Sequence, residues 1–165
     1  IELNDKKNNF NNKYYSNEHG INSRLDEIQS TILNIKLSKV NLWINERKKL
    51  AKIYHDNLKD TSLALPKVKN ECKHVFHLYV VYHPKRNEIM KILKKQKIKL
   101  NINYPYPIHK MKAYNKDTCI KFKNLNITEN ASKGIFSLPL YPKLAEKYVL
   151  KIAKVLKQIL SQNNW

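Results

Sequence analysis

The fold class is decided by one short stretch, VFHLYVVY, which runs from Val75 to Tyr82. Aromatic and β-branched residues dominate it and Pro84 bounds it, and both features favour a strand. Two more short stretches, 98–104 and 135–140, are also expected to be strands, the first because apolar and polar residues alternate along it. Since helical patterns surround all three, the sequence predicts an α+β fold with helices packed on a small sheet.

Helical periodicity dominates the rest of the chain. Apolar residues recur at spacings of three and four along 23–58, which is expected to form one long kinked helix or a helix pair. Shorter helices are expected after Pro84 and over 128–131, and a final helix from about Lys143 to Leu160. The apolar stripes of these helices consist of Leu25, Ile28, Ile32, Ile35, Trp43, Leu50, Tyr54, Leu58, Ile89, Ile92, Leu93, Leu144, Ile152, Val155, Leu156 and Ile159.

The composition excludes several classes of protein. A chain of 165 residues, 42% of them hydrophobic, is long enough for one domain with a core. Cys72 and Cys119 are too few for a disulfide framework and fit a reducing cytoplasm, and no apolar run has the length of a membrane span. Gly20 and Gly134 are the only glycines, which excludes a glycine-rich phosphate loop, because such loops need several residues without a Cβ.

The net charge of +19 raises the question of nucleic-acid binding. Phosphate contacts normally use both lysine and arginine, whereas this chain has 29 lysines and 3 arginines, spread along its whole length. It also has 21 asparagines, and A/T-rich codons encode both lysine and asparagine, so genome composition explains the bias. We therefore expect a solvated, lysine-covered surface, with neither nucleic acid nor a membrane as a partner.

Histidine and cysteine residues gather in one segment, which contains Cys72, His74, His77 and His83. Side chains alternate between the two faces of a strand, so His74 and His77 are expected to point in opposite directions and no metal site is expected. His77 is expected to be a half-buried structural histidine. The G-x-S-x-G and H-E-x-x-H motifs of hydrolases are absent from the sequence, so the residues alone predict only a soluble α+β domain.

Four blocks of the sequence resemble a known protein family, and this resemblance indicates a function. The first block, HGINSRLDEIQ from His19 to Gln29, resembles the G-x-N-x-R-L-D-E-x-Q signature of the DegT/DnrJ/EryC1/StrS family. FHLYVV (76–81), YPYPIH (104–109) and SLPLYP (137–142) follow in the order found in that family. Members of the family are pyridoxal-phosphate-dependent aminotransferases that act on nucleotide-linked keto-sugars.

The resemblance implies the C-terminal small domain of a fold-type-I pyridoxal-phosphate-dependent transferase, with a mostly antiparallel sheet. The expected divisions are a lead-in from the large domain over 1–22, a connecting helix or helix pair over 23–58, and a small α+β domain over 59–165. In relatives, the Schiff-base lysine and the aspartate that holds the pyridine nitrogen precede the first block. No catalytic residue is therefore expected in this chain, which alone is expected to be inactive.

The complete enzyme is expected to be a cytoplasmic homodimer that transfers an amino group, most often from glutamate, to a nucleotide-linked keto-sugar. Such a reaction serves amino-sugar and cell-surface glycan biosynthesis. Asn22 matches the family asparagine that hydrogen-bonds the cofactor phosphate of the neighbouring subunit, and a turn residue is its structural alternative. Arg24 could bind a carboxylate or phosphate of the substrate, or pair with Asp26 and Glu27 nearby.

Two positions of the proline-rich loop match residues that line the sugar-nucleotide site in relatives. These are Tyr104 and His109, whose structural alternatives are packing beside the prolines and a place at the start of a helix. At the position before Tyr104 relatives often carry histidine, whereas this chain has Asn103. That departure argues against a proton-transfer or sugar-binding role for Asn103.

Two other classes of function are alternatives to an enzyme. One is a stand-alone basic binding or structural module derived from the same fold, which an upstream reading frame with the lysine motif would exclude. The other, weaker, is a nucleic-acid-binding protein, whose affinity for DNA would fall steeply with salt. The helix expected over 25–58 bridges two domains in the family, so this chain is expected to expose an apolar strip there and to self-associate.

Overall fold

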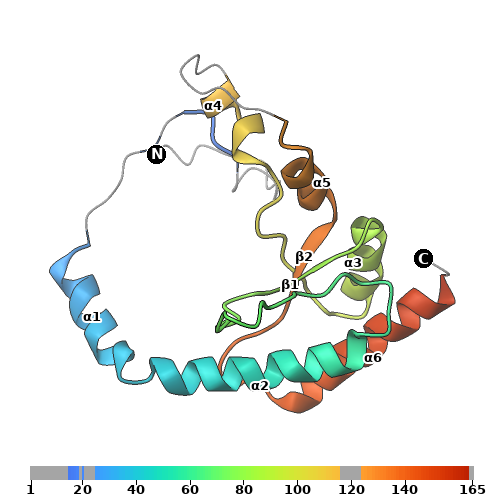
Figure 1. Ribbon diagram of the computed structural model, residues 1–165, viewed down its shortest axis with the longest axis horizontal. Coiled ribbons are helices and arrows are strands. Elements are labelled where there is room, and N and C mark those ends of the chain that lie inside the picture. Colours follow the sequence, from blue (N-terminus) through green and yellow to red (C-terminus); the bar gives the residue numbers. More distant parts are fainter. Residues whose placement is uncertain (1–14, 19, 21–24, 116–123, 164–165) are drawn as a thin grey trace. The chain divides into compact units, whose positions relative to one another are not determined.

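The computed structural model describes residues 15–18, 20, 25–115 and 124–163 (Figure 1). The chain divides into two compact units. Unit 1 comprises Ile1–Asn22 and Tyr104–Lys133, and unit 2 comprises Ser23–Asn103 and Gly134–Trp165. The chain therefore leaves unit 2 after Asn103 and returns to it at Gly134. Helices together with an antiparallel two-stranded sheet confirm the predicted α+β class.

Unit 2 contains the longest helices of the described chain. Helices α1 (Glu27–Leu37) and α2 (Val40–Leu58) follow one another across a short turn, in which the Lys39 amide donates to the Lys36 carbonyl over 2.9 Å. The stretch expected as one kinked helix or a pair is therefore a pair. Helices α3 (Arg86–Lys95) and α6 (Glu146–Gln162) confirm two further helices that periodicity predicted.

The sheet of unit 2 joins two distant segments of the chain. Strands β1 (Tyr79–Tyr82) and β2 (Ile135–Leu138) are antiparallel, with Tyr79 opposite Leu138 and Tyr82 opposite Ile135. Isolated bridges add Ala64 beside Tyr82 and Asn101 beside Ser137, one on each outer side of the pair. The sheet is thus narrow and depends on pairing between residues far apart in sequence.

Of the three predicted strands, two are shorter than expected and the one over 98–104 is wrong. Strand β1 begins at Tyr79 rather than at Val75, because Phe76 has a φ of 48°, in the left-handed region, and interrupts the extended backbone. Over 98–104 the described structure has a single bridge at Asn101 and no strand, and Lys97, with a φ of 62°, turns the chain just before it. Strand β2 ends before Pro139, which has no N–H to donate.

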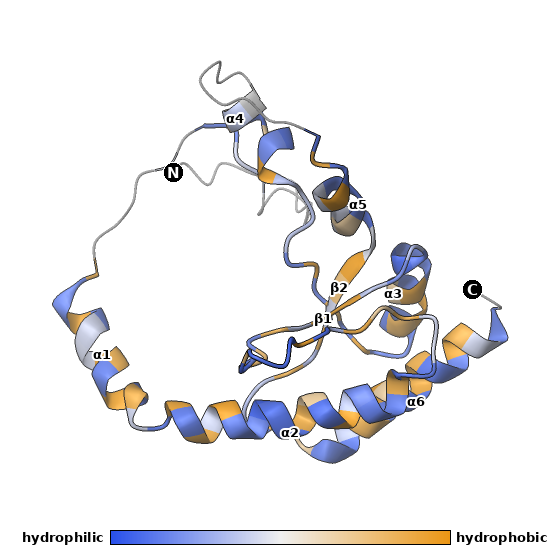
Figure 2. Ribbon diagram, viewed as in Figure 1, coloured by the Kyte–Doolittle hydropathy of each residue, from blue (hydrophilic) through white to orange (hydrophobic). Residues whose placement is uncertain are grey.

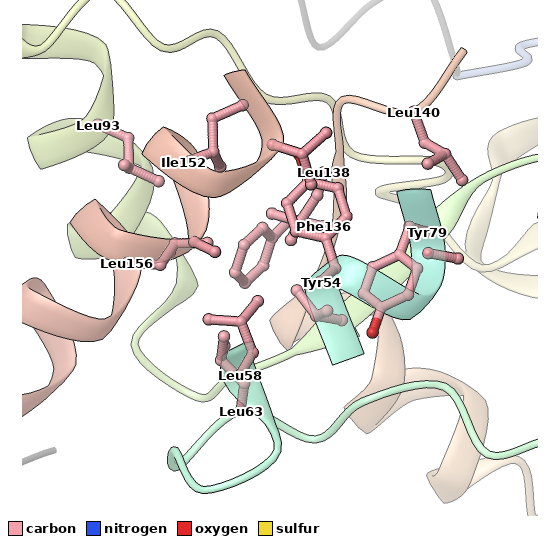
Figure 3. Packing of buried hydrophobic residues seen from close by; sticks show 14 of the residues in the cluster. Tyr54, Leu58, Leu63, Tyr79, Leu93, Phe136, Leu138, Leu140, Ile152 and Leu156 are labelled. Atoms are coloured by element: carbon pink, nitrogen blue, oxygen red, sulfur yellow. The ribbon is translucent and has the colours of Figure 1, made fainter. Parts of the chain in front are cut away.

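The core of unit 2 lies where α2 and α6 pack against each other and against the sheet (Figure 3). Helix α2 contributes Tyr54 and Leu58, both fully buried, and α6 contributes Leu156. Phe136 of β2 lies among them in Figure 3. Burial of each such side chain contributes about 1.5–3 kcal/mol, so this shared core stabilises unit 2.

Helix α1 differs from the other long helices because none of its residues is buried. Ile28 is 76% exposed and Ile35 is 70% exposed, so the stripe expected along this helix faces solvent. Figure 2 shows apolar residues distributed along α1 and the start of α2. Among the described residues, no helix combines the length and apolar character needed to cross a membrane.

Unit 1 is built around the proline-rich loop. After Pro107 the chain forms one turn of 3-10 helix, η2 (Ile108–Lys110), then the short helix α4 (Lys112–Asn115), and later α5 (Asn126–Gly134), which confirms the helix expected over 128–131. The ring of Tyr15 meets that of Tyr106 edge-on, with centroids 5.3 Å apart. The Tyr15 hydroxyl accepts a hydrogen bond from the Lys112 amide over 3.1 Å, which connects the early segment to the start of α4.

Gly134 stands where α5 ends and β2 begins. Its carbonyl oxygen accepts a hydrogen bond from the His83 amide over 3.0 Å, so the two backbones lie close together. A Cβ at this position would lie 2.7 Å from Cδ2 of Tyr82 and 2.9 Å from the carbonyl oxygen of His83. The position therefore requires glycine because of close approach, not because of a phosphate.

Candidate functional site

The four residues that the family resemblance assigned to binding fall into two groups. Asn22 and Arg24 lie outside the described residues. Tyr104 and His109 lie in the part of unit 1 that the structure describes, on the loop and on η2 respectively. The geometry therefore bears only on the second group.

The loop before η2 presents a tyrosine to solvent. Tyr104 is 62% exposed. Each proline restricts the residue before it to extended conformations, and Pro107 itself has φ −63° and ψ 137°, so the loop is stiff. Tyr106 packs edge-on against Tyr15, which anchors the middle of the loop. An exposed phenol on an anchored loop is suited to a hydrogen bond with a polar ligand.

His109 is almost buried and is held by a carboxylate. Its side chain is 9% exposed, and its Nε2 lies 3.0 Å from Oε1 of Glu129, whose side chain is 30% exposed. Nζ of Lys110 lies 3.1 Å from the same oxygen. The hydrogen bond from His109, and then that from Lys110, lower the pKa of Glu129, so the carboxylate is ionised near neutral pH.

Glu129 is a residue that the sequence did not mark as functional. It lies on α5, 20 residues beyond His109, and its expected role was only that of a helix residue. No short motif links the two positions, because their contact depends on how α5 folds back onto η2. The only feature of the sequence that pointed to Glu129 is that it is an acidic residue in the first turn of this helix.

The side chain of Asn103 contacts strand β2 of unit 2. Its Oδ1 accepts a hydrogen bond from the hydroxyl of Ser137 over 3.2 Å, and Ser137 is 5% exposed. The Ser137 amide donates to the carbonyl of Asn101 over 2.7 Å, next to this side-chain contact. Asn103 therefore has a structural partner, and the expectation that it has no proton-transfer role stays a prediction.

The histidine cluster predicted on one strand is not on a strand. His74 and His77 precede β1, and both are exposed, so the prediction of a half-buried His77 is wrong. The left-handed Phe76 between them ends the strand alternation from which we expected His74 and His77 to point in opposite directions. Within the described ranges, no group of three or more potential metal ligands lies together.

His83 is the buried histidine of this segment, at 2% exposure. Its Nδ1 accepts from the Lys85 amide over 3.0 Å, so in the neutral ring Nε2 carries the proton and donates to the hydroxyl of Ser62 over 3.2 Å. Burial is the main cause that lowers the pKa of His83; nearby Glu88 opposes the shift and Lys85 adds to it. These contacts make His83 a structural histidine.

A groove with a volume of about 520 Å³ runs beside α2 in unit 2. Tyr79 is one of the lining residues, and its buried hydroxyl has no hydrogen-bond partner within the described part of the chain. Burial is the main cause that raises the pKa of Tyr79 to about 12, so the hydroxyl stays protonated. No sequence motif marks this groove, whose other lining residues are Lys48, Ala51, Lys52, His55, Asp56, Pro66, Lys67, Val68 and Phe76.

Comparison with known proteins places this geometry in a family. The sequence pattern of the DegT/DnrJ/EryC1/StrS aminotransferase family matches residues 3–157, which include the loop, η2 and α5. The chain belongs to this aminotransferase family. The match confirms the resemblance found in the four blocks of sequence.

Individual relatives in the aminotransferase family agree with this placement. The chain is 37% identical over 153 residues to a dTDP-3-amino-3,4,6-trideoxy-alpha-D-glucose transaminase of Micromonospora megalomicea subsp. nigra, covering 90% of this chain and 41% of that protein. It is 34% identical over 146 residues to a dTDP-3-amino-3,6-dideoxy-alpha-D-galactopyranose transaminase of Aneurinibacillus thermoaerophilus, covering 88% and 39%. The chain thus spans about two fifths of the length of the relatives it matches.

Solved structures of the family share the fold. The structure of S. venezuelae DesV in complex with a ketimine intermediate superposes with a TM-score of 0.77 at 29% identity, covering 90% of this chain and 40% of that chain. A DegT DnrJ EryC1 StrS aminotransferase from Brucella abortus gives a TM-score of 0.76 at 29% identity, covering 86% and 37%. These similarities confirm the expected fold of a portion of such an aminotransferase.

Proposed function

We propose that the chain is the C-terminal part of a pyridoxal-phosphate-dependent aminotransferase that transfers an amino group, from glutamate, to a nucleotide-linked keto-sugar. The observation that carries this proposal is the match of the family over residues 3–157, together with relatives named as dTDP-sugar transaminases. A relative from Acidithiobacillus ferrooxidans, 30% identical, is named for a UDP-linked sugar, so we propose the class of substrate and not one nucleotide.

The cofactor would be held in part by Asn22. An asparagine amide offers two N–H donors, which suit the anionic oxygens of a phosphate. In our proposal Asn22 reaches the cofactor of the neighbouring subunit of a homodimer, and Arg24 offers its guanidinium to an acidic group of the substrate. When bound, pyridoxal phosphate supplies the electron sink that the transfer of an amino group requires.

Tyr104 and His109 would bind the nucleotide-sugar. Tyr104 is 62% exposed, and a phenol hydroxyl can donate a hydrogen bond to a sugar hydroxyl or phosphate oxygen. His109 lies five residues further on, on η2, where its ring is largely shielded from water. Fixed polar groups of this kind orient a substrate, and orientation is a large part of what a protein contributes to a cofactor-dependent reaction.

The experiment uses the complete gene product, defined by the coding sequence around this segment. The purified protein is expected to bind pyridoxal phosphate, seen as a visible absorption band, and to aminate a nucleotide-linked keto-sugar with glutamate as donor. Residues 1–165 alone are expected to do neither. A complete product that binds no cofactor and aminates no such sugar would favour the alternative, a basic binding or structural module derived from the same fold.

A further inference from the structure

We propose that Glu129 is a positioning residue, which holds the imidazole of His109 in one tautomer and one orientation for the nucleotide-sugar. The inference rests on the proposed function for its substrate, but the contact between the two side chains stands on its own. The proposal gives a role to a residue of α5, a helix that contains none of the sequence motifs or binding residues discussed above.

The geometry sets the direction of the hydrogen bond. Nε2 of His109 lies 3.0 Å from Oε1 of Glu129, and an ionised carboxylate can only accept. Nε2 must therefore carry a proton, and in the neutral ring Nδ1 is then the nitrogen without one. At 9% exposure the ring cannot easily exchange this partner for water, so the carboxylate fixes both the tautomer and the angle of the ring.

Lys110 adds to the contact with His109 in lowering the pKa of Glu129. Its ammonium lies 3.1 Å from the same carboxylate oxygen, while its side chain is 58% exposed. Solvent screens a pair of this kind, so it adds little to stability. Its effect is to favour the ionised carboxylate, which is the acceptor that His109 needs.

The first test measures the tautomer in the complete gene product. Two-bond proton–nitrogen spectra of the imidazole nitrogens are recorded for the wild type, for Glu129→Ala and for Glu129→Gln, with His109→Gln to assign the signals. The wild type is expected to show His109 with a proton on Nε2, and Glu129→Ala is expected to show a mixture of tautomers. Glu129→Gln keeps a neutral acceptor and is expected to fall between the two. Identical His109 signals in wild type and Glu129→Ala would overturn the proposal.

The second test separates positioning from a general effect on folding. Glu129→Ala is expected to raise the KM for the nucleotide-sugar about ten-fold, the size expected for loss of one hydrogen bond to a charged group, with an unchanged KM for glutamate. Because Glu129 acts through His109, the double variant His109→Gln with Glu129→Ala should be no worse than His109→Gln alone. Additive losses, or an equal rise in both KM values, would contradict the proposal.

The matched control is Glu88→Ala, which removes an exposed first-turn glutamate of α3 that pairs with Lys85 at 4.0 Å. It is expected to leave both KM values unchanged. If the wild type aminates no nucleotide-sugar while the tautomer still depends on Glu129, the proposed function fails and the positioning contact stands. If amination is normal in Glu129→Ala, the proposed function stands and the positioning role fails.

Discussion

The hydroxyl of Tyr54 donates a hydrogen bond to the carbonyl oxygen of Pro139, 3.0 Å away and 85 residues further along the chain. This bond connects α2 to the residue that follows β2. The ring of Tyr79 lies beside that of Tyr54, with centroids 5.2 Å apart, but its hydroxyl has no partner within the described part of the chain. Two neighbouring tyrosines thus differ in one hydrogen bond.

This difference predicts opposite results for two identical substitutions. Tyr54→Phe is expected to lower the free energy of unfolding by about 1 kcal/mol, because it leaves the Pro139 carbonyl without its donor. Tyr79→Phe is expected to leave stability unchanged or to raise it, because it removes a buried hydroxyl that gains nothing from its surroundings. Urea unfolding measures both. An equal loss in the two variants would show that Tyr79 has a partner in solution.

Alanine substitutions at the two glycines are predicted to differ in their effect on stability. Gly134→Ala is expected to cost about 1–3 kcal/mol, because the added Cβ would overlap the ring of Tyr82 and the carbonyl of His83. Gly20→Ala is the control, since nothing lies within 4 Å of a Cβ there. Thermal unfolding followed by circular dichroism compares them. A stable Gly134→Ala protein would mean that the ring of Tyr82 and the backbone at Gly134 can move apart at little cost.

His83 predicts a dependence of stability on pH. Burial lowers its pKa below the ordinary value of 6.5, so between the lowered and the ordinary value the unfolded chain binds more protons than the folded chain. Stability should therefore fall as pH drops below about 6.5, and His83→Asn, which keeps an acceptor for the Lys85 amide, should flatten this slope. Urea unfolding at several pH values at constant ionic strength measures it, with the exposed His77→Asn as the control. An unchanged slope in His83→Asn would assign the pH dependence to other groups.

The exposed face of α1 predicts self-association of residues 1–165. Ile28 and Ile35 are both at least 70% exposed, and apolar surface of this kind usually finds a partner. Changing both to glutamate is expected to convert associated chains into monomers in sedimentation velocity. Ile127→Glu, at an isolated position that is 88% exposed on α5, is the control. A wild-type chain that remains monomeric at high concentration would contradict the prediction.

Asn22 predicts an effect on the cofactor in the complete enzyme. Asn22→Ala should weaken binding of pyridoxal phosphate by about 1.5–3 kcal/mol, the value of a hydrogen bond to a charged group, and excess cofactor should restore most of the turnover. If the contact is made across a dimer, mixing Asn22→Ala with a variant that lacks the Schiff-base lysine should recover activity at limiting cofactor. No recovery despite proven subunit exchange would show that Asn22 does not act across the interface.

The sequence predicted those features that depend on local periodicity. Helix α6 was predicted because Ile152, Leu156 and Ile159 repeat at helical spacing, and all three are buried. The strand expected over 98–104 failed because alternation says nothing about partners, and only Asn101 reaches one. The pairing of His109 with Glu129 could not be predicted, because the two residues are 20 positions apart and no local pattern links them.

The packing of α2 against α6 has a consequence for synthesis of the protein on the ribosome. Helix α2 is complete at Leu58, but the six buried residues of α6 follow only after Glu146. At about 5–20 residues per second, the ribosome needs roughly 4–20 s to make the chain in between. Throughout that interval Leu50, Tyr54 and Leu58 lack the helix that covers them in the folded protein. The nascent chain therefore presents an apolar helix face for seconds, which is long enough for a chaperone to bind it.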